Sequence, residues 1–341
     1  MHELLWQPRC ERPVGLIRPV RLDPAGVAGP TRSQARSRKW RSTGHGWYVD
    51  ARAAPTCVEQ RILEQAVKVE RGGVVTGWAV LRWHGARYFD GLTAGGRQRE
   101  VPLIRLTGRY PKGADWRRHK IGAQEQEIVA GIRCATVQRA LFDEMRFSDL
   151  RSAVVAMEMA AAAGLTSSWL MTLYTSHRQG WEGIPLVREA LTLAGDDSRS
   201  PQETRLKLVW ILDSGLPYPV VNQPVFDLRG NLLGIPDLLD PCLGVVGEYD
   251  GVDHKDRDRH RKDVEREQRY REHGLEYFTV VGGDLRDRDM VARRIHAARS
   301  RARVLEVPRR WTLRQPPWWR AQESLDARLI RAGRVGELIR W

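Results

Sequence analysis

The stretch Ile235-Pro-Asp-Leu-Leu-Asp-Pro-Cys-Leu-Gly-Val-Val-Gly-Glu-Tyr-Asp-Gly251 contains two apolar runs separated by a turn-forming segment. Leu232 to Leu239 and Val245 to Gly251 each predict a strand, joined by a turn over Asp240 to Gly244. With that turn centred between Cys242 and Leu243, Asp237 faces Glu248 across the hairpin. Because side chains alternate along a strand, Asp250 shares the face of Glu248. The sequence therefore predicts three carboxylates on one patch.

Like charges on neighbouring strands repel, and burial makes the repulsion worse, so this patch requires a compensating cation. Mg²⁺ (or Mn²⁺) prefers oxygen ligands and is often held by one or two carboxylates with water and substrate phosphate. Such an ion polarises a phosphodiester and activates water. Asp237, Glu248 and Asp250 are therefore candidate metal ligands of a phosphodiester hydrolase. The alternative is that they are solvated acidic residues at a strand end.

Two segments precede this hairpin. Ser200-Pro-Gln-Glu-Thr-Arg-Leu predicts a helix start, with Ser200 as the N-cap and Pro at the first helical position. Glu203 is either a capping carboxylate and partner of Lys207 or a member of the site. The segment from Pro224, a Gly230-Asn231 turn and the strand from Leu232 predict a further hairpin, and hence an antiparallel meander.

A charged helix over Asp256 to His273 is expected after the acidic strand, ending at Gly274 before an apolar strand from Leu275 to Val281. His254 lies close enough to the acidic strand to shuttle a proton or contact phosphate at the rim of the site. An ordinary surface histidine is the alternative. The cations Lys255, Arg257, Arg261 and Lys262 either bind the nucleic-acid backbone or solvate the helix.

Several motifs resemble, in this order, the PD-(D/E)XK nuclease superfamily, most closely its very-short-patch-repair-like endonuclease domains: Ser200-Pro-x-Glu-Thr-Arg-Leu, Ile235-Pro-Asp237, Gly-Glu248-Tyr-Asp250-Gly251, His254, the Arg261-to-Asp263 region and Gly274. The resemblance implies a restriction-endonuclease-like α/β/α domain with a central mixed sheet. It also implies Mg²⁺ (or Mn²⁺) at Asp237, Glu248 and Asp250, with Glu203 and His254 as further catalytic positions.

The sequence departs from that pattern at two places. Asp250 stands where many members of the superfamily carry a Lys, so the activating positive charge must come from Lys255, Lys262 or the metal itself. The last strand, Tyr277 to Val281, lacks the Arg that relatives often place there.

The segment from Thr31 to Asp50 interleaves cations with Trp40, Trp47 and Tyr48. A helix capped by Thr31, a turn at Gly44 to Gly46 and a strand over Trp47 to Val49 are typical of a winged helix. A solvated basic segment is the alternative. Together with Val74 to Gly85 and Cys134 to Asp143, this region resembles the AbiEi-type antitoxin region. That resemblance implies a DNA-binding winged helix with contacts from Arg36, Arg38, Lys39 and Arg41.

The whole chain of 341 residues carries a net charge of +14, with 56 Lys and Arg against 42 Asp and Glu, which favours a polyanionic partner. The four cysteines are widely spaced, which disfavours a zinc knuckle or disulfide framework and suits a cytoplasmic protein. No apolar run is long enough to span a membrane.

We therefore expect an α+β protein with a winged-helix-like module over 1–52, an AbiEi-like α+β and helical region over 53–195, a nuclease-like domain over 200–290 and a basic tail over 291–341. In that tail, Trp318 and Trp319 either stack on bases or pack onto their own domain. The expected function is metal-dependent cleavage of double-stranded DNA. The alternative is an AbiEi-type DNA-binding regulator that pairs with a toxin and keeps an inactive nuclease-like fold.

Overall fold

The structure is a computed structural model that describes residues 6–44, 46–69, 73–105, 115–117, 120–251, 257–321 and 323–333, without the side chains of 116–117 and 257–263. The protein is a mixture of helices and mixed sheets, so the expected α+β class is confirmed. The chain divides into a first unit up to Leu191 and a second unit from Thr192. This division falls just ahead of the predicted domain boundary between 195 and 200. None of the described helices has the length and apolarity to cross a bilayer.

The second unit contains, in chain order, α7 (Pro201–Leu208), the π-helical turn η3 (Val209–Asp213), β9 (Val220–Val221), β10 (Val225–Asp227), β11 (Leu232–Gly234), β12 (Leu238–Asp240), β13 (Val245–Asp250), α8 (Arg257–Glu272), β14 (Glu276–Val281), the 3-10 turn η4 (Asp284–Arg286), α9 (Arg288–Arg303), β15 (Trp311–Thr312) and α10 (Leu325–Arg331). The predicted helix start is confirmed, because the Ser200 hydroxyl accepts a hydrogen bond from the Glu203 N–H at 3.3 Å. The predicted end of α8 is confirmed too, since Gly274 follows it with a φ of +81°.

The main sheet of the second unit has the strand order β14-β13-β12-β9. Strands β12 and β13 pair antiparallel with Leu238 opposite Gly247, which is the predicted register. Strands β13 and β14 pair in parallel, and the chain between them passes through α8. Parallel neighbours need such a crossover. The C-terminal end of β13, where Glu248 and Asp250 lie, is therefore beside the C-terminal end of β14.

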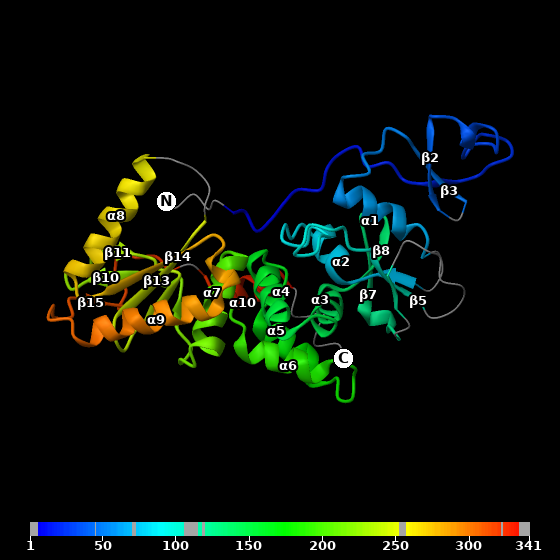
Figure 1. The fold of residues 1–341 in the computed structure, drawn as a ribbon. Helices are drawn as coiled ribbons and strands as arrows, with labels where there is room; N and C mark the ends of the chain where they lie inside the picture. Colours follow the sequence, from blue (N-terminus) through cyan, green and yellow to red (C-terminus); the bar gives the residue numbers. More distant parts are fainter. Residues whose placement is uncertain are drawn as a thin grey trace. The chain divides into compact units, whose positions relative to one another are not determined.

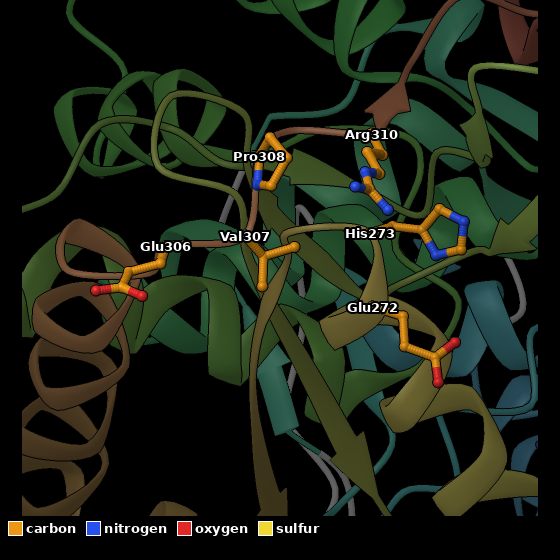
Figure 2. A pocket seen from close by; sticks show the side chains of 6 residues that line it. All are labelled: Glu272, His273, Glu306, Val307, Pro308 and Arg310. Atoms are coloured by element: carbon orange, nitrogen blue, oxygen red, sulfur yellow. The ribbon is translucent and has the colours of Figure 1, made fainter.

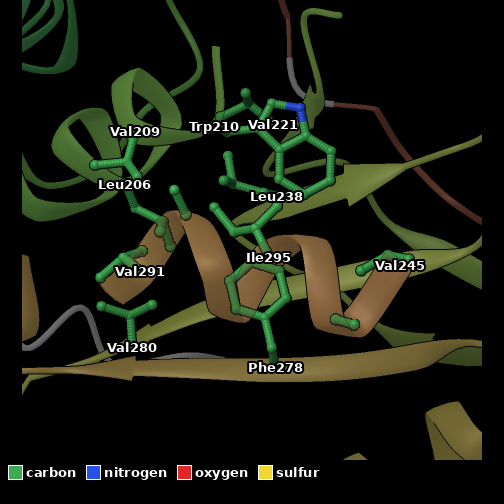
Figure 3. Close-up of a cluster of buried hydrophobic side chains, with 12 residues drawn as sticks. Leu206, Val209, Trp210, Val221, Leu238, Val245, Phe278, Val280, Val291 and Ile295 are labelled. Atoms are coloured by element: carbon green, nitrogen blue, oxygen red, sulfur yellow. The ribbon is translucent and has the colours of Figure 1, made fainter. Parts of the chain in front are cut away.

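Helices cover both faces of this sheet (Figure 1). On one face, Val291 and Ile295 of α9 pack with Leu206, Trp210, Val245 and Phe278 (Figure 3). On the other face, Tyr270 of α8 packs with Leu239 and Val246. The Trp210 and Phe278 rings stack at 6.4 Å. A Cβ at Gly247 would collide with the Phe278 ring, so the glycine in this buried strand permits a close approach.

The expected continuous strand over Leu232 to Leu239 is wrong. Its first part, β11, joins the sheet β11-β10-β15, and its last part, β12, joins the main sheet. Pro236 lies in the break and has no N–H to give to a ladder, so one strand cannot run through it. The break places Asp237 immediately before β12.

The core of the second unit continues beyond residue 290, the predicted end of the nuclease-like domain. Val291, Ile295 and Ala298 of α9 are fully buried, and Trp311 of β15 is 2% exposed in the core beneath β10. The apolar positions of α9 recur at helical spacing and need a sheet to cover them. The expected helix from Ser324 is confirmed as α10, capped by the Ser324 hydroxyl.

The first unit contains β1 (Val20–Arg21), η1 (Gln34–Arg36), β2 (Trp40–Gly44), β3 (Trp47–Asp50), α1 (Val58–Ala66), β4 (Gly73–Val75), α2 (Gly77–Trp83), β5 (Pro102–Arg105), β6 (Asp115–Arg117), η2 (Ala123–Glu125), β7 (Gln126–Val129), β8 (Ile132–Ala135), α3 (Val137–Arg146), α4 (Leu150–Ala162), α5 (Ser168–Ser176) and α6 (Ile184–Leu193). Its sheets have the orders β1-β3-β2 and β6-β5-β4-β8-β7. The strand expected at Trp47 is confirmed, whereas the helix expected after Thr31 is only the short 3-10 turn η1.

A buried ion network lies beneath the helices of the first unit. The Arg139 guanidinium, which is fully buried, donates to Glu125 at 2.8 Å and to Asp143 at 3.1 Å. Glu125 also accepts hydrogen bonds from Tyr174 at 2.6 Å and Arg178 at 2.9 Å. Each buried carboxylate of this network is thus bound by a guanidinium.

Candidate carboxylate site

Asp237 immediately precedes β12, and its carboxylate accepts a hydrogen bond from the backbone N–H of Tyr249 at 2.7 Å. The register of β12 and β13 places it opposite Glu248, on the face that carries Leu239 and α8. Burial raises the pKa of Asp237 well above its usual range, and the negative charges of Glu203 and Glu248 add to that effect. The Tyr249 N–H and the charge of Arg266 oppose the rise. Asp237 is therefore a carboxyl held among like charges.

Glu248 is the most buried carboxylate of the site, with 7% of the residue exposed. Its Oε2 accepts hydrogen bonds from the Arg266 guanidinium at 2.5 Å and from the Tyr277 hydroxyl at 3.0 Å. Arg266 comes from α8 and Tyr277 from β14, so side chains of two separate elements donate to one oxygen of Glu248. The site already contains one cation, supplied by the chain itself.

Glu203 of α7 lies close enough to Asp237 for its charge to raise the pKa of Asp237. Its carboxylate accepts hydrogen bonds from the backbone N–H of Arg199 at 2.8 Å and from the Asn222 side chain at 2.7 Å. The backbone N–H of Asn222 in turn donates to the carbonyl of Asp237 at 3.2 Å. Asn222 therefore couples the two acidic residues. Glu203 caps the helix in part, because it accepts a hydrogen bond from the backbone N–H of Arg199, which precedes the N-cap Ser200. It also lies beside the site.

Tyr270 places a buried hydroxyl close to these carboxylates. The residue is fully buried, and its hydroxyl has no hydrogen-bond partner within the described part of the chain. Burial and the negative charge of Glu248 raise the pKa of Tyr270, and its ring stacks on that of Tyr277 at 6.1 Å. A Cβ at Gly234 would collide with this hydroxyl. Buried polar groups normally have a partner, so this hydroxyl is a polar group that the described residues leave unsatisfied near Glu248.

Asp250 shares the predicted face but is exposed at the end of β13. Across the described residues, no three or more Asp, Glu, His or Cys side chains form a group that could hold a metal ion. We expected three carboxylates on one patch. The structure brings Asp237 and Glu248 together, and Asp250 lies outside this pair at the end of β13.

The pair Asp237 and Glu248 fits a hard divalent ion by the chemistry of its donors. Two carboxylates suffice where water and substrate phosphate complete the shell. Burial and the acidic neighbours raise the pKa of Asp237, and an added positive charge would offset both effects.

The remaining predicted residues of the second unit are only partly described. His254 and Lys255 lie outside the described residues. The backbones of Arg257, Arg261 and Lys262 lie in α8, and their side chains lie outside the described part. Their proposed contacts with a nucleic-acid backbone remain predictions.

The four cations predicted for DNA binding in the first unit do not behave alike. Arg36, Arg38 and Lys39 are exposed. Arg41 instead forms two hydrogen bonds with Glu64 of α1, at 3.0 and 2.6 Å. This bidentate pair ties β2 to α1 and occupies the guanidinium, so Arg41 has a structural role that the sequence did not reveal.

Trp318 and Trp319 both pack edge-on against Phe226 but differ in exposure. Trp319 is half-buried and packs edge-on against the buried Phe226 ring at 5.3 Å, as the packing alternative requires. Trp318 is 58% exposed and donates its ring N–H to the carbonyl of Gly230 at 3.2 Å.

A surface pocket of the second unit lies at the opposite end of the parallel strands from Glu248 and Asp250. Figure 2 shows its lining by Glu272, His273, Glu306, Val307, Pro308 and Arg310. It adjoins the start of β14, and its lining mixes acidic and basic side chains. It is therefore separate from the carboxylate site.

Arg266, Asn222 and Tyr277 are residues of the site that were not predicted from the sequence. A signal for Arg266 existed, because it lies one turn before Tyr270, the tyrosine of an otherwise highly charged helix, and so faces the same sheet. No comparable signal pointed to Asn222, whose role depends on a φ of +50° that brings it between two other elements.

Comparison with protein-family models, with curated proteins and with solved structures finds no match to this chain.

Proposed function

We propose that the protein is a metal-dependent DNA endonuclease whose reaction centre is the pair Asp237 and Glu248. The observation that carries this proposal is the facing of two carboxylates across β12 and β13 beside a third, Glu203, with the pKa of Asp237 raised by burial and by that like charge. Strongly perturbed carboxyls that share a site are more typical of function than of structural ion pairs.

Asp237 and Glu248 would hold Mg²⁺ or Mn²⁺, which supplies Lewis-acid polarisation of the phosphodiester when bound. Tyr277 orients the Glu248 carboxylate through its hydroxyl. Asn222 orients Glu203 against the backbone of Asp237. Glu203 or His254 accepts the proton that the attacking water loses. The likeness to PD-(D/E)XK nucleases and their restriction-endonuclease-like fold belongs to this proposal, and so does the winged-helix character of residues 1–52.

The test is nicking of supercoiled plasmid by the purified protein with Mg²⁺ or Mn²⁺. We expect Asp237→Asn and Glu248→Gln each to lower the rate by at least about 100-fold. Asp250→Asn should have a smaller effect, because Asp250 is exposed beyond the pair. Glu203→Gln and His254→Ala separate the two proton acceptors. Metal-dependent nicking that survives in Asp237→Asn would refute the assignment of the site.

Binding to duplex DNA is proposed to use the exposed cations Arg36, Arg38 and Lys39. Replacing all three by Gln should weaken binding and lower the salt dependence by about 0.9 in log-log slope for each phosphate that no longer has a cationic partner. Arg52→Gln is the matched control, since Arg52 follows the same small sheet and pairs with Asp50 at 2.8 Å. Equal effects of the control and the triple variant would exclude this surface.

A second candidate function, an AbiEi-type DNA-binding regulator with an inactive nuclease-like unit and a toxin partner, is favoured by one observation. Glu248 is already bound by Arg266, as a purely structural carboxylate would be. This candidate predicts DNA binding without metal-dependent cleavage, and unchanged binding in Glu248→Gln. Cleavage by the wild type that Glu248→Gln abolishes would exclude it.

A further inference from the structure

The Arg266 guanidinium occupies a position beside Glu248 that a divalent ion bound to this carboxylate would need. It donates to Glu248 Oε2 at 2.5 Å, and its side chain is only 20% exposed. A guanidinium and a divalent ion on the same carboxylate repel each other strongly at such distances. Both cannot hold Glu248 in the same way at the same time.

The Arg266 side chain is also suited to contact a different partner. It lies on α8, a helix of charged residues, one turn before the buried Tyr270 that fixes α8 on the sheet. One-fifth of the Arg266 side-chain surface is exposed, and its guanidinium contacts Glu248 on the face of the sheet that α8 covers. Its planar donors suit two oxygens of a phosphate as well as they suit a carboxylate.

We propose, on the basis of the function proposed above, that Arg266 is the resident cation of the carboxylate site. Before a divalent ion binds, Arg266 neutralises Glu248. When the ion binds, Arg266 leaves Glu248 and contacts a phosphate of the substrate. Metal loading and substrate binding are coupled through this one side chain, and Arg266 supplies the positive charge that Asp250 does not provide.

A coupling of this kind has an unusual signature. Removing a competing cation strengthens metal binding, whereas removing a group that binds phosphate weakens cleavage. Arg266→Gln should therefore bind Mn²⁺ about tenfold more tightly than the wild type by calorimetry, while it nicks plasmid more slowly and with a higher KM. A merely structural arginine would lower both metal affinity and activity when it is replaced.

The matched control is Arg271→Gln. Arg271 lies on the same helix and contacts another buried carboxylate, Glu276 of β14, at 3.1 Å. It belongs to the opposite end of the parallel strands, so this variant should leave Mn²⁺ affinity unchanged. A similar tightening in both variants would overturn the proposal, because it would reflect net charge alone.

Arg266→Lys serves where Arg266→Gln does not fold. An ammonium is a point charge that cannot hold two oxygens in parallel, so this variant should bind Mn²⁺ at least as tightly as the wild type and cut more slowly. Weaker Mn²⁺ binding in either folded variant overturns the role of Arg266 and leaves the metal site standing. Absence of Glu248-dependent Mn²⁺ binding in the wild type overturns both proposals.

Discussion

The two units of the protein bury carboxylates in contrasting surroundings. In the first unit, burial tends to raise the pKa of Glu125, yet the hydrogen bonds from Tyr174 and Arg178 and the charge of Arg139 leave it lowered. In the second unit, burial and the charge of Glu203 raise the pKa of Asp237. A buried carboxylate is thus not by itself a sign of function. A buried carboxylate whose neighbouring charges are also negative is the stronger indication of a functional site.

The largest effect should come from breaking the balanced network of the first unit. Arg139→Met leaves Glu125 and Asp143 buried without the guanidinium that joins them, and should lower the free energy of unfolding by about 3–5 kcal/mol. Urea denaturation followed by tryptophan fluorescence measures the change. A decrease below about 1 kcal/mol would mean that this network contributes little, and the contrast between the two regions would fail.

A smaller effect of opposite sign is expected at the carboxylate site. In buffer with a chelator, Asp237→Asn should raise the free energy of unfolding by about 1–2 kcal/mol, because Asn keeps an acceptor for the Tyr249 N–H and removes a charge facing Glu203 and Glu248. Asp240→Asn is the control. Asp240 lies at the other end of β12 and pairs with Arg299, so its replacement should destabilise. Lower stability in both variants would show that Asp237 is an ordinary structural carboxylate.

The pH dependence of the free energy of unfolding should also differ between the two regions, with each carboxyl contributing about 1 kcal/mol. A carboxyl with a raised pKa holds its proton more tightly in the folded state, so stability is highest below its unfolded pKa of 3.8 and falls as the pH rises through the folded pKa. Glu125 does the reverse, since its lowered pKa gives stability above 4.5 that disappears in acid. Denaturation of the wild type and Asp237→Asn between pH 4 and 8 tests this, and equal slopes would contradict it.

The smallest effect should come from an exposed ion pair. Arg52 contacts Asp50 at 2.8 Å, but 84% of the Arg52 side chain is exposed. Arg52→Ala should change the free energy of unfolding by less than about 0.5 kcal/mol, because solvent screens the pair. A change as large as that of Arg139→Met would show that burial is not what separates strong ion pairs from weak ones in this protein.

The local parts of the carboxylate site were predictable from sequence. The turn residues from Asp240 to Gly244 and the alternation of the two apolar runs determined the register that faces Asp237 with Glu248. The break at Pro236 was missed because the apolar pattern continues through it, although a proline cannot.

Long-range parts of the structure were harder to predict. Helix α1 buries Glu59, Gln60 and Glu64 beside its apolar residues, and the partners of these polar side chains do not follow from their spacing. Arg266 reaches Glu248 only because α8 packs across β13. Its spacing from Tyr270 indicates that it faces a sheet, but not which strand or which carboxylate it meets. Polar contacts between distant elements depend on the whole fold rather than on a local pattern.

The parallel pairing of β13 with β14 has a consequence for the order in which the chain folds. The turn after Asp240 closes β12 onto β13 within a few residues, whereas Tyr277 and Arg266 reach Glu248 only after the crossover through α8. Local contacts form sooner than distant ones. We therefore expect the hairpin to assemble before Arg266 of α8 offsets the charge of Glu248, so that its two carboxylates repel each other most strongly at that stage. Mild acid or divalent cations should thus speed the refolding of the second unit, whereas Arg266→Gln should act chiefly on the rate of unfolding.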